Sequence, residues 1–569
     1  MTDDHKTDEV SGRPPEADGA DGGSRRRPIV TVVTLVGLLV ALVAAVVAGT
    51  LLSHHSSPTT VASAQDMPLA SNPSLDPGTA LNKPAPDFTL RDQFGRRTSL
   101  SDYRGKVVIL GFNDSECTTV CPLSTTAMVD ARRYLGAAGS KVVLLGIDAN
   151  PKATSRADVL SYSRAHGMLH QWRFLTGSPA QLKRVWNAYG IGVQITGGQI
   201  DHTPALYLID PQGRLRKFWW TQMNYSSIPQ LGQLMAQEAS SVLPGHPAVH
   251  SSLSYAQVPP IPPTSTTSVP LAKGGTIGLG PGHARLLLFF ATWDSQDLPD
   301  LRNRLRALDA YAGDRTLPEL MAVDEGSVEP SAATLPRFLH SLVGPLAYPV
   351  AIDKTGRLAD GYEVQDQPWF VLVSASGKID WFWDVATQGW LSQHALATQV
   401  RAALAHPTVK KPPSTAVAQS QLAGSPAPLA ALHSQASQLL GSDSALQARV
   451  RALRGYPVVI NAWASWCNPC QAEYPLFQSA SLRYGREVAF IGANTEDYPN
   501  DARSFLAKHP LSYPSYQGTL SQLAPLAPVF NLPTTIFINR TGKVTHVKGG
   551  QYDTQGSLDG DIRTYALGS

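Results

Sequence analysis

Apolar runs that begin and end at matching places divide most of the chain into three similar stretches. The early runs read VVILGF, RLLLFFATW and PVVINAWASW, and each is followed by a segment with helix-forming residues. The late runs begin at a proline, as PALYLID from Pro204, PWFVLVS from Pro368 and PTTIFIN from Pro533. Each late run leads into a short glycine turn and a further apolar strand, which is a hairpin pattern. The pattern therefore predicts an α/β fold repeated three times.

Strands and helices in this order, with a proline-led hairpin at the end, are the outline of a thioredoxin fold. The alternative is three unrelated α/β domains that share the pattern by chance. Stretches rich in proline, serine and threonine separate the three units and predict extended linkers. The predicted division is a cytoplasmic tail (1–28), a membrane span (29–52), a linker (53–79), a first domain (80–242), a linker (243–272), a middle domain without cysteines (273–405), a linker (406–428) and a third domain (429–569).

One segment near the start of the chain has the length and composition of a membrane anchor. Ile29 to Leu52 contains no charged residue, and a helix of this length spans a hydrocarbon core of ~30 Å. Arg25, Arg26 and Arg27 precede it, so the positive-inside rule leaves the N-terminus in the cytoplasm. We expect an uncleaved single-pass anchor in the cell membrane, with the bulk of the protein extracytoplasmic.

The cysteines form two close pairs, and the chain of 569 residues has only these 4. They are too few for a disulfide scaffold, and several hundred residues separate the pairs, which argues against a four-cysteine zinc site. The net charge of +3 is nearly neutral for this length and predicts no nucleic-acid partner. We therefore interpret the two cysteine pairs as two separate thiol sites in an oxidising compartment.

The third unit contains Cys467 and Cys470 in the sequence WCNPC, where an apolar strand gives way to a helix. Free amides and the positive end of the helix dipole stabilise a thiolate on the first cysteine of such a pair. Cys467 is therefore predicted to attack a disulfide, and Cys470 to resolve the mixed disulfide that results. Together they predict a thiol–disulfide oxidoreductase.

The segment from Leu429 to the C-terminus, with LRGYPVVINAWASWCNPCQAE and LPTTIFINRTGKV, resembles the TlpA/ResA family of anchored extracytoplasmic reductases. The resemblance implies that Pro533 is a cis-proline opposite the cysteine pair. We expect this domain to use no cofactor. It also implies that Glu473 is a semi-buried acid that tunes cysteine protonation. The alternative for Glu473 is an acid in the first helical turn that complements the helix dipole.

The first unit contains Cys117 and Cys121 in the spacing C-x-x-x-C, which on a helix places both sulfurs on one face. Two thiolates with an imidazole suit Cu(I), and His202 precedes the late strand of the same unit. We therefore expect Cys117, Cys121 and His202 to be the ligands of one Cu(I) ion.

Residues 81–237 resemble the Sco copper-chaperone family, whose signature is C-x-x-x-C-P with a distant histidine before a Y-L-I-D-P-x-G strand. The chain departs from the family at Thr118 and Thr119, where members usually carry Pro-Asp. It also has Pro204 where Sco proteins normally have another residue. A peroxiredoxin is a further alternative because of T-x-x-C-P, but Asp114 and Pro204 stand where its activating proline and arginine would fall.

The middle unit has Asp294 and Asp297 where the cysteines of the other units would lie, so it cannot exchange thiols. A scaffold or docking role is the favoured interpretation, and a carboxylate metal site is the alternative, although acids are favoured at a helix start in any case.

The three units together predict an enzyme that reduces disulfides in extracytoplasmic partner proteins. By family resemblance, its task would be assembly of the copper centre of a respiratory oxidase, whose subunit would be a partner. The alternatives are a Cu(I) chaperone kept reduced by its fused third domain, and a cytochrome c maturation reductase.

Overall fold

A computed structural model describes the part of the chain that carries the three units. The described residues are 72, 75–76, 78–196, 199–294, 300–407, 414–441, 443–465, 467–495, 497, 499–519, 523–527, 529, 532–552 and 554–568. All of them belong to one compact unit that begins at Gln65. None of the described helices is both long enough and apolar enough to cross a membrane. The predicted anchor, Ile29 to Leu52, lies outside the described residues.

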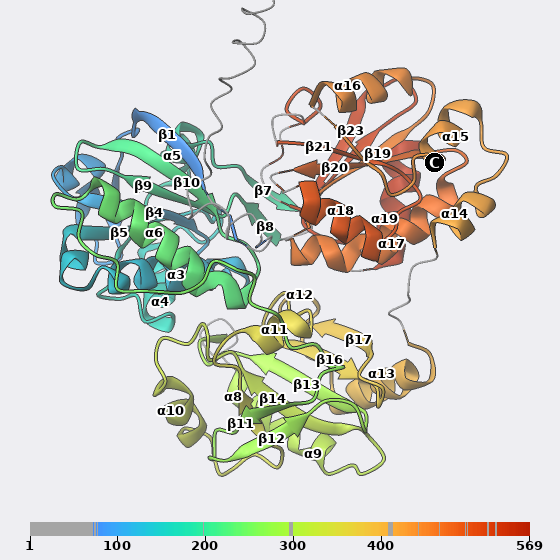
Figure 1. Ribbon diagram of the computed structural model, residues 1–569. Helices are drawn as coiled ribbons and strands as arrows, with labels where there is room; N and C mark the ends of the chain where they lie inside the picture. Colours follow the sequence, from blue (N-terminus) through green and yellow to red (C-terminus); the bar gives the residue numbers. More distant parts are fainter. Residues whose placement is uncertain are drawn as a thin grey trace, which may run out of the picture. The chain divides into compact units, whose positions relative to one another are not determined.

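The first domain is built on a mixed sheet of eight strands (Figure 1). Its strands are β1 (Thr79–Pro84), β2 (Thr89–Asp92), β3 (Arg97–Ser99), β4 (Val107–Asn113), β5 (Val142–Asp148), β6 (Arg173–Thr176), β9 (Ala205–Ile209) and β10 (Arg214–Trp220), in the spatial order β1-β10-β9-β4-β5-β6-β2-β3. A separate hairpin joins β7 (Val193–Thr196) to β8 (Gln199–His202). Its helices are α3 (Val120–Tyr134), α4 (Arg156–Ala165), α5 (Pro179–Tyr189) and α6 (Ile228–Val242).

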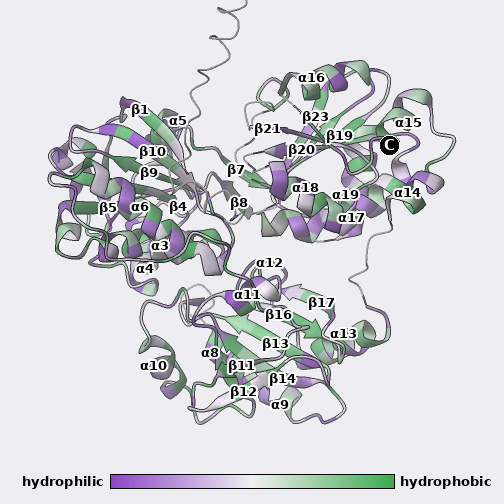
Figure 2. Cartoon of the chain, in the orientation of Figure 1, coloured by the Kyte–Doolittle hydropathy of each residue, from purple (hydrophilic) through white to green (hydrophobic). Residues whose placement is uncertain are grey.

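The middle domain has a five-stranded sheet in the order β15-β14-β13-β16-β17. These strands are β13 (Arg285–Phe290), β14 (Glu319–Asp324), β15 (Val350–Ile352), β16 (Trp369–Val373) and β17 (Ile379–Asp384), beside a small hairpin of β11 (Thr267–Pro270) and β12 (Thr276–Leu279). Its helices are α8 (Leu301–Ala307), α9 (Asp309–Ala312), α10 (Thr334–His340), α11 (Arg357–Gly361), α12 (Val385–Gln388) and α13 (Gln393–Ala405). The buried strands β13 and β16 are drawn mostly in the hydrophobic colour in Figure 2.

The third domain has a six-stranded sheet in the order β18-β21-β20-β19-β22-β23. These strands are β18 (Leu439–Leu440), β19 (Val458–Trp463), β20 (Ala489–Thr495), β21 (Ser515–Gly518), β22 (Thr534–Ile538) and β23 (Val544–Gly549). The helices are α14 (Thr415–Gln421), α15 (Ala427–His433), α16 (Asp443–Ala452), α17 (Asn468–Tyr484), α18 (Pro499–Lys508) and α19 (Gln555–Asp561), and the π-helix η5 (Ile562–Leu567) follows.

One strand order recurs in all three sheets. A central strand (β4, β13 or β19) pairs in parallel with the next strand of its domain and antiparallel with a later strand that belongs to a hairpin. Such fully buried central strands need apolar residues on both faces, which explains the uninterrupted runs in the sequence. The three stretches with a common sequence pattern therefore have a common sheet topology.

Two segments expected to be extended linkers are partly ordered against their neighbours. In the segment 243–272, Gln230 of α6 donates from Nε2 to the backbone oxygens of Ser254 and Ala256, and Tyr255 is buried. Within 406–428, residues Thr415–Gln421 form the short helix α14, and its Ala418 is fully buried. Serine and proline content predicted extension, but buried contacts with the adjoining domains determine the local structure.

Candidate functional site

The cysteine pair of the third domain lies at the junction of β19 and α17. Cys467 is the N-cap residue of α17, and its sulfur accepts a hydrogen bond from the backbone N–H of Cys470 over 3.2 Å. The two cysteines form a disulfide with Cα atoms 5.2 Å apart. Cys467 is 3% exposed and Cys470 is fully buried, so the first cysteine is the more exposed of the two. The helix start therefore presents an amide to the sulfur that sequence analysis predicted to be the nucleophile.

The loop before Cys467 is held by a carboxylate that the sequence did not identify. Ser465 donates to Asp497 from its backbone N–H over 2.6 Å and from its hydroxyl over 2.7 Å. Asn494, at the end of β20, donates to the same carboxylate over 2.7 Å. Gln471 of α17 donates to the backbone oxygen of Ser465 over 2.8 Å. Asp497 thus fixes the approach of the chain to the redox pair, and only its place just after the buried strand β20 hinted at this role.

Glu473 is fully buried and joins three elements of the third domain. Asn461 of β19 donates from Nδ2 to its Oε1 over 2.6 Å, and the backbone N–H of Tyr552 donates to its Oε2 over 3.0 Å. Because α17 begins at Asn468, Glu473 lies beyond the first helical turn, and that turn contains no acid. The interpretation as a first-turn acid is therefore wrong. The structure instead places Glu473 in the second turn of α17, on the side that faces β19 and Tyr552.

Pro533 opens β22 as the sequence pattern placed it, and the Leu532–Pro533 peptide bond is cis. Leu532 packs against the hydrophobic cluster that contains Cys467 and Cys470. The corresponding Gln367–Pro368 bond of the middle domain is also cis, whereas the Thr203–Pro204 bond of the first domain is not. The proline-led strands are thus alike in position but not all alike in peptide geometry.

The cysteines of the first domain do not share one helix face. The helix α3 begins at Val120, so Cys121 lies in its first turn and Cys117 lies in the loop before it. The expectation of an i,i+4 pair on one helix is wrong because the chain becomes helical only after Thr119. The pair is nevertheless in contact, since the backbone N–H of Cys121 donates to the Cys117 sulfur over 3.4 Å.

The surroundings of the two sulfurs shift the pKa values of the two thiols in opposite directions. Burial raises the pKa of the Cys117 thiol, but hydrogen bonds from Cys121 and Thr119 outweigh burial, and the net pKa is lowered. Burial raises the pKa of Cys121 well above its ordinary value, and the neighbouring Cys117 raises it further. Cys117, which is the more exposed of the two, is therefore the sulfur that ionises first.

His202 is brought to this cysteine pair from a distant part of the sequence. It ends β8, is buried, and places Nε2 at 3.5 Å from the Cys121 sulfur. Its Nδ1 lies 3.1 Å from the backbone oxygen of Thr203, which fixes the orientation of the ring. Two thiols and one imidazole nitrogen are a donor set that suits Cu(I). As they stand, the described residues include no group of three or more His, Cys, Asp and Glu side chains positioned to hold a metal ion.

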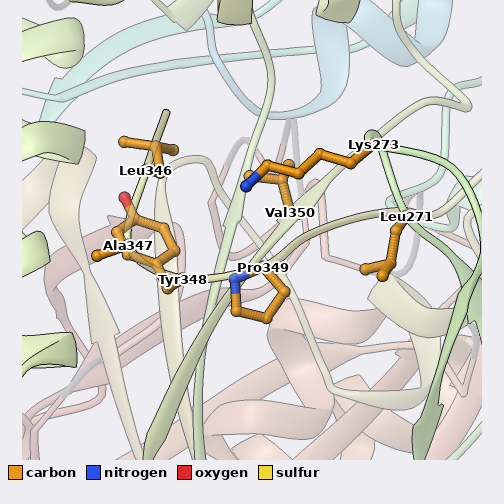
Figure 3. A pocket seen from close by; sticks show the side chains of 7 residues that line it. All are labelled: Leu271, Lys273, Leu346, Ala347, Tyr348, Pro349 and Val350. Atoms are coloured by element: carbon orange, nitrogen blue, oxygen red, sulfur yellow. The ribbon is translucent and has the colours of Figure 1, made fainter. Parts of the chain in front are cut away.

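The middle domain places Asp294 where the other two domains have cysteines. The side chain is fully buried and accepts a hydrogen bond from the backbone N–H of Ala291 over 3.0 Å. Asp297 lies outside the described residues. A cavity of about 230 Å³ in the same domain is formed by an apolar wall and one lysine, drawn in Figure 3. It is lined by Leu271, Lys273, Leu346, Ala347, Tyr348, Pro349 and Val350, none of which carries thiol chemistry.

Two family models match the chain, each over less than half of its length. Residues 78–231 match the SCO1/SenC family, and residues 424–547 match the AhpC/TSA family. No family model among these covers the middle domain.

Curated relatives support the same two assignments. The thiol–disulfide oxidoreductase ResA of Bacillus subtilis is 29% identical over 17% of this chain and 55% of its own length. ResA of Oceanobacillus iheyensis is also 29% identical, over 17% of this chain and 52% of its own length. The chain thus spans about half the length of these ResA proteins. The SCO1 protein homolog of Bacillus subtilis is 26% identical over 24% of this chain and 74% of its own length.

Among solved structures, copper-bound ScoI of Bradyrhizobium japonicum is 23% identical, with a TM-score of 0.25 over 28% of this chain and 99% of that one. The thioredoxin domain of the oxidoreductase BVU-2223 from Bacteroides vulgatus is 22% identical, with a TM-score of 0.20 over 24% of this chain and 88% of that one. Their TM-scores are too low to support an assignment. The family models and curated relatives identify a mixed α/β chain with thioredoxin-like domains, one similar to Sco proteins and one similar to thiol–disulfide oxidoreductases.

Proposed function

We propose that the protein is a membrane-anchored, extracytoplasmic thiol–disulfide oxidoreductase whose third domain reduces disulfides in partner proteins. The observation that carries the proposal is the position of Cys467 at the N-cap of α17, with the amide of Cys470 directed at its sulfur. An amide donor and the helix dipole favour the thiolate, which is the nucleophile in disulfide exchange. Similarity to ResA proteins supports the same activity.

The reaction begins with the reduced form of the pair. The Cys467 thiolate attacks one sulfur of the partner's disulfide, so that a mixed disulfide forms and the other partner sulfur leaves as a thiolate that takes a proton. Cys470, once deprotonated, attacks the Cys467 sulfur and releases the second partner thiol. The partner gains two electrons and two protons, and the Cys467–Cys470 disulfide forms. An external dithiol donor must then reduce that disulfide before another cycle.

A second function, binding and delivery of Cu(I), is favoured by the contact between Cys121 and His202 at 3.5 Å. In this role copper is cargo, held by the thiolates of Cys117 and Cys121 and the imidazole of His202. Thiolate and imidazole donors select Cu(I), and an occupied site would protect both thiols from oxidation. Similarity to the SCO1 protein homolog of Bacillus subtilis supports this role for the first domain.

The two functions fit one task, the assembly of a copper centre that contains two cysteines, as in a respiratory oxidase subunit. Those cysteines must be reduced before copper can enter, so the third domain would have to act on the partner before the first domain delivers copper. Without copper delivery, the same reductase chemistry would suit the maturation of cytochrome c. The middle domain, which repeats the sheet topology but has Asp294 in place of a cysteine, would be a thioredoxin-like scaffold.

A trapping experiment tests the reductase proposal. Cys470→Ser in the full chain leaves Cys467 able to attack but unable to resolve, so covalent complexes with partner proteins should accumulate. Cys467→Ser is the matched control and should accumulate few. Equal trapping by the two variants would overturn the assigned roles, and mass spectrometry of the complexes would name the partner.

Copper stoichiometry tests the second function. The reduced full chain should retain one Cu(I) per molecule in competition with a weak chelator, and Cys117→Ser should lose it. If the unmodified chain takes up no copper, Cys117 and Cys121 are a redox pair and the chaperone function is excluded.

A further inference from the structure

Thr118, inside the C-x-x-x-C motif of the first domain, is hydrogen-bonded to a residue of the middle domain. Its hydroxyl donates to Oδ1 of Asp366 over 2.7 Å, across 248 positions of sequence. Asp366 belongs to the loop before β16, residues 363–368, which we call the pre-β16 loop. Asp366 is 7% exposed, and the nearby Cys117 contributes to the raised pKa of its carboxyl, after burial and Asp384. The pre-β16 loop therefore lies directly against the loop between β4 and α3, residues 114–119, which we call the cysteine loop.

Further polar contacts join the same two domains around this point. The carboxylate of Asp360, in α11, accepts the backbone N–H groups of Tyr225 over 2.8 Å and of Ser226 over 3.0 Å. Gln367 of the pre-β16 loop donates from Nε2 to the hydroxyl of Tyr225 over 3.3 Å. A carboxylate that accepts two backbone amides is a specific contact, because Tyr225 and Ser226 are buried and their amides would be costly to leave unpaired.

The apolar part of the contact is continuous with the cores of both domains. One hydrophobic cluster contains Cys121 and Met128 of the first domain together with Val364 and Trp369 of the middle domain. Elsewhere on the interface the rings of His166 and Trp293 lie 4.6 Å apart between centroids. A shared, fully buried cluster of this kind is typical of a stable interface rather than of a linker contact.

The backbone itself is closely fitted at the interface. Gly356 of the middle domain has a φ of +70°, and a Cβ added to it would lie 2.2 Å from Cβ of Tyr225. No side chain fits there without separating the domains. In contrast, Gly344 of the same domain has a φ of +80°, and a Cβ there would meet only the tip of Arg306 at 3.6 Å.

We propose that the pre-β16 loop of the middle domain is a docking surface for the cysteine loop of the first domain, and that docking restricts access to Cys117. Thr118 is the residue that makes the cysteine loop specific for this surface, which accounts for a hydroxyl where Sco proteins usually carry proline. The middle domain is thus a resident partner that a copper donor or a disulfide partner must displace. This docking is independent of both proposed functions, because its contacts exist whichever chemistry Cys117 performs.

Site-resolved alkylation of the reduced full chain tests the docking. If the sulfur reacts mainly after undocking, the rate at Cys117 follows the undocking equilibrium. Thr118→Val removes one hydrogen bond of ordinary strength and should accelerate alkylation of Cys117 about five-fold. Gly356→Ala should accelerate it further, because the added Cβ clashes with Tyr225 of the first domain and so favours separation of the two domains. An unchanged far-ultraviolet circular-dichroism spectrum in both variants distinguishes undocking from unfolding.

Matched controls separate docking from local effects. Gly344→Ala imposes a similar positive-φ strain on the middle domain without a clash and should leave the rate unchanged. Thr119→Val removes a hydroxyl that contacts the Cys117 sulfur and does not contact Asp366. This variant should not accelerate alkylation. Unchanged rates in both Thr118→Val and Gly356→Ala would overturn the proposal, as would equal acceleration by Gly344→Ala. Acceleration accompanied by a loss of the circular-dichroism signal would also overturn it, because access would then follow from unfolding.

Discussion

Asn461 Nδ2 and Glu473 Oε1 lie 2.6 Å apart in the interior of the third domain, joining the central strand β19 to the helix that carries the redox pair. The second carboxylate oxygen accepts the backbone N–H of Tyr552. Two donors thus converge on a buried acid that has only acceptor capacity when ionised. The arrangement makes Glu473 a structural link between strand, helix and the loop before α19, in direct reach of the element that positions Cys467 and Cys470.

Glu473→Gln should destabilise the third domain. The amide group of glutamine would face either Asn461 Nδ2 or the Tyr552 N–H, so one buried donor would lose its acceptor at a cost of about 1–3 kcal/mol. Urea unfolding of the full chain, followed at the transition of the third domain, measures the loss. Glu487→Gln, at an exposed position of the same domain, is the control. Equal stability of the two variants would contradict the structural role.

His202→Ala should weaken Cu(I) binding while leaving the cysteines able to bind. A two-coordinate dithiolate would remain, and because loss of partners of metal ligands already costs 10–100-fold in affinity, we expect a loss on the order of 100-fold. Competition with a chelator of known affinity, on the reduced full chain, gives the change. His170→Ala removes an exposed histidine of the same domain and should have no effect. Unchanged affinity in His202→Ala would remove the imidazole from the site.

Asp294→Ala should leave disulfide reduction by the third domain unchanged. Its carboxylate accepts the Ala291 N–H within the middle domain, so the variant should lower the stability of that domain without touching the Cys467–Cys470 pair. Turnover of a model disulfide with a dithiol donor is the measurement, and Cys467→Ser, which should be inactive, sets the baseline. A large loss of turnover in Asp294→Ala would reveal a catalytic carboxylate in the middle domain.

The sequence predicted the sheet pattern and the helix start at Cys467 because both depend on short-range signals. Apolar runs marked β4, β13 and β19, and the spacing of Cys467 and Cys470 marked a helix start. The helical placement of Cys117 failed because residue spacing does not reveal where a helix begins, and no N-cap side-chain hydrogen bond forms at Thr119. Contacts such as Thr118 with Asp366, or Ser465 with Asp497, join distant segments. No periodicity in the sequence encodes them.

His166 predicts how the stability of the first domain depends on pH. The ring is 8% exposed, lies 4.1 Å from Tyr162 and 4.6 Å from Trp293 between centroids, and burial lowers its pKa from 6.5 to about 3. Between these two values the unfolded chain binds a proton that the folded chain does not, so stability is full above pH 6.5 and falls as the pH decreases. At pH 5 this one group should cost about 2 kcal/mol.

His166→Phe keeps an aromatic ring between Tyr162 and Trp293 but removes the titration. The decrease in the unfolding temperature of the first domain between pH 7 and pH 5 should therefore be smaller in this variant than in the unmodified chain. Calorimetry at the two pH values measures it, and the third domain provides an internal reference, since burial also lowers the pKa of its His433 and His509 and the variant leaves both in place. His170→Phe, at an exposed position, should keep the full decrease. If His166→Phe shows the same pH dependence as the unmodified chain, His166 does not bind its proton on unfolding, and another group must account for the acid sensitivity.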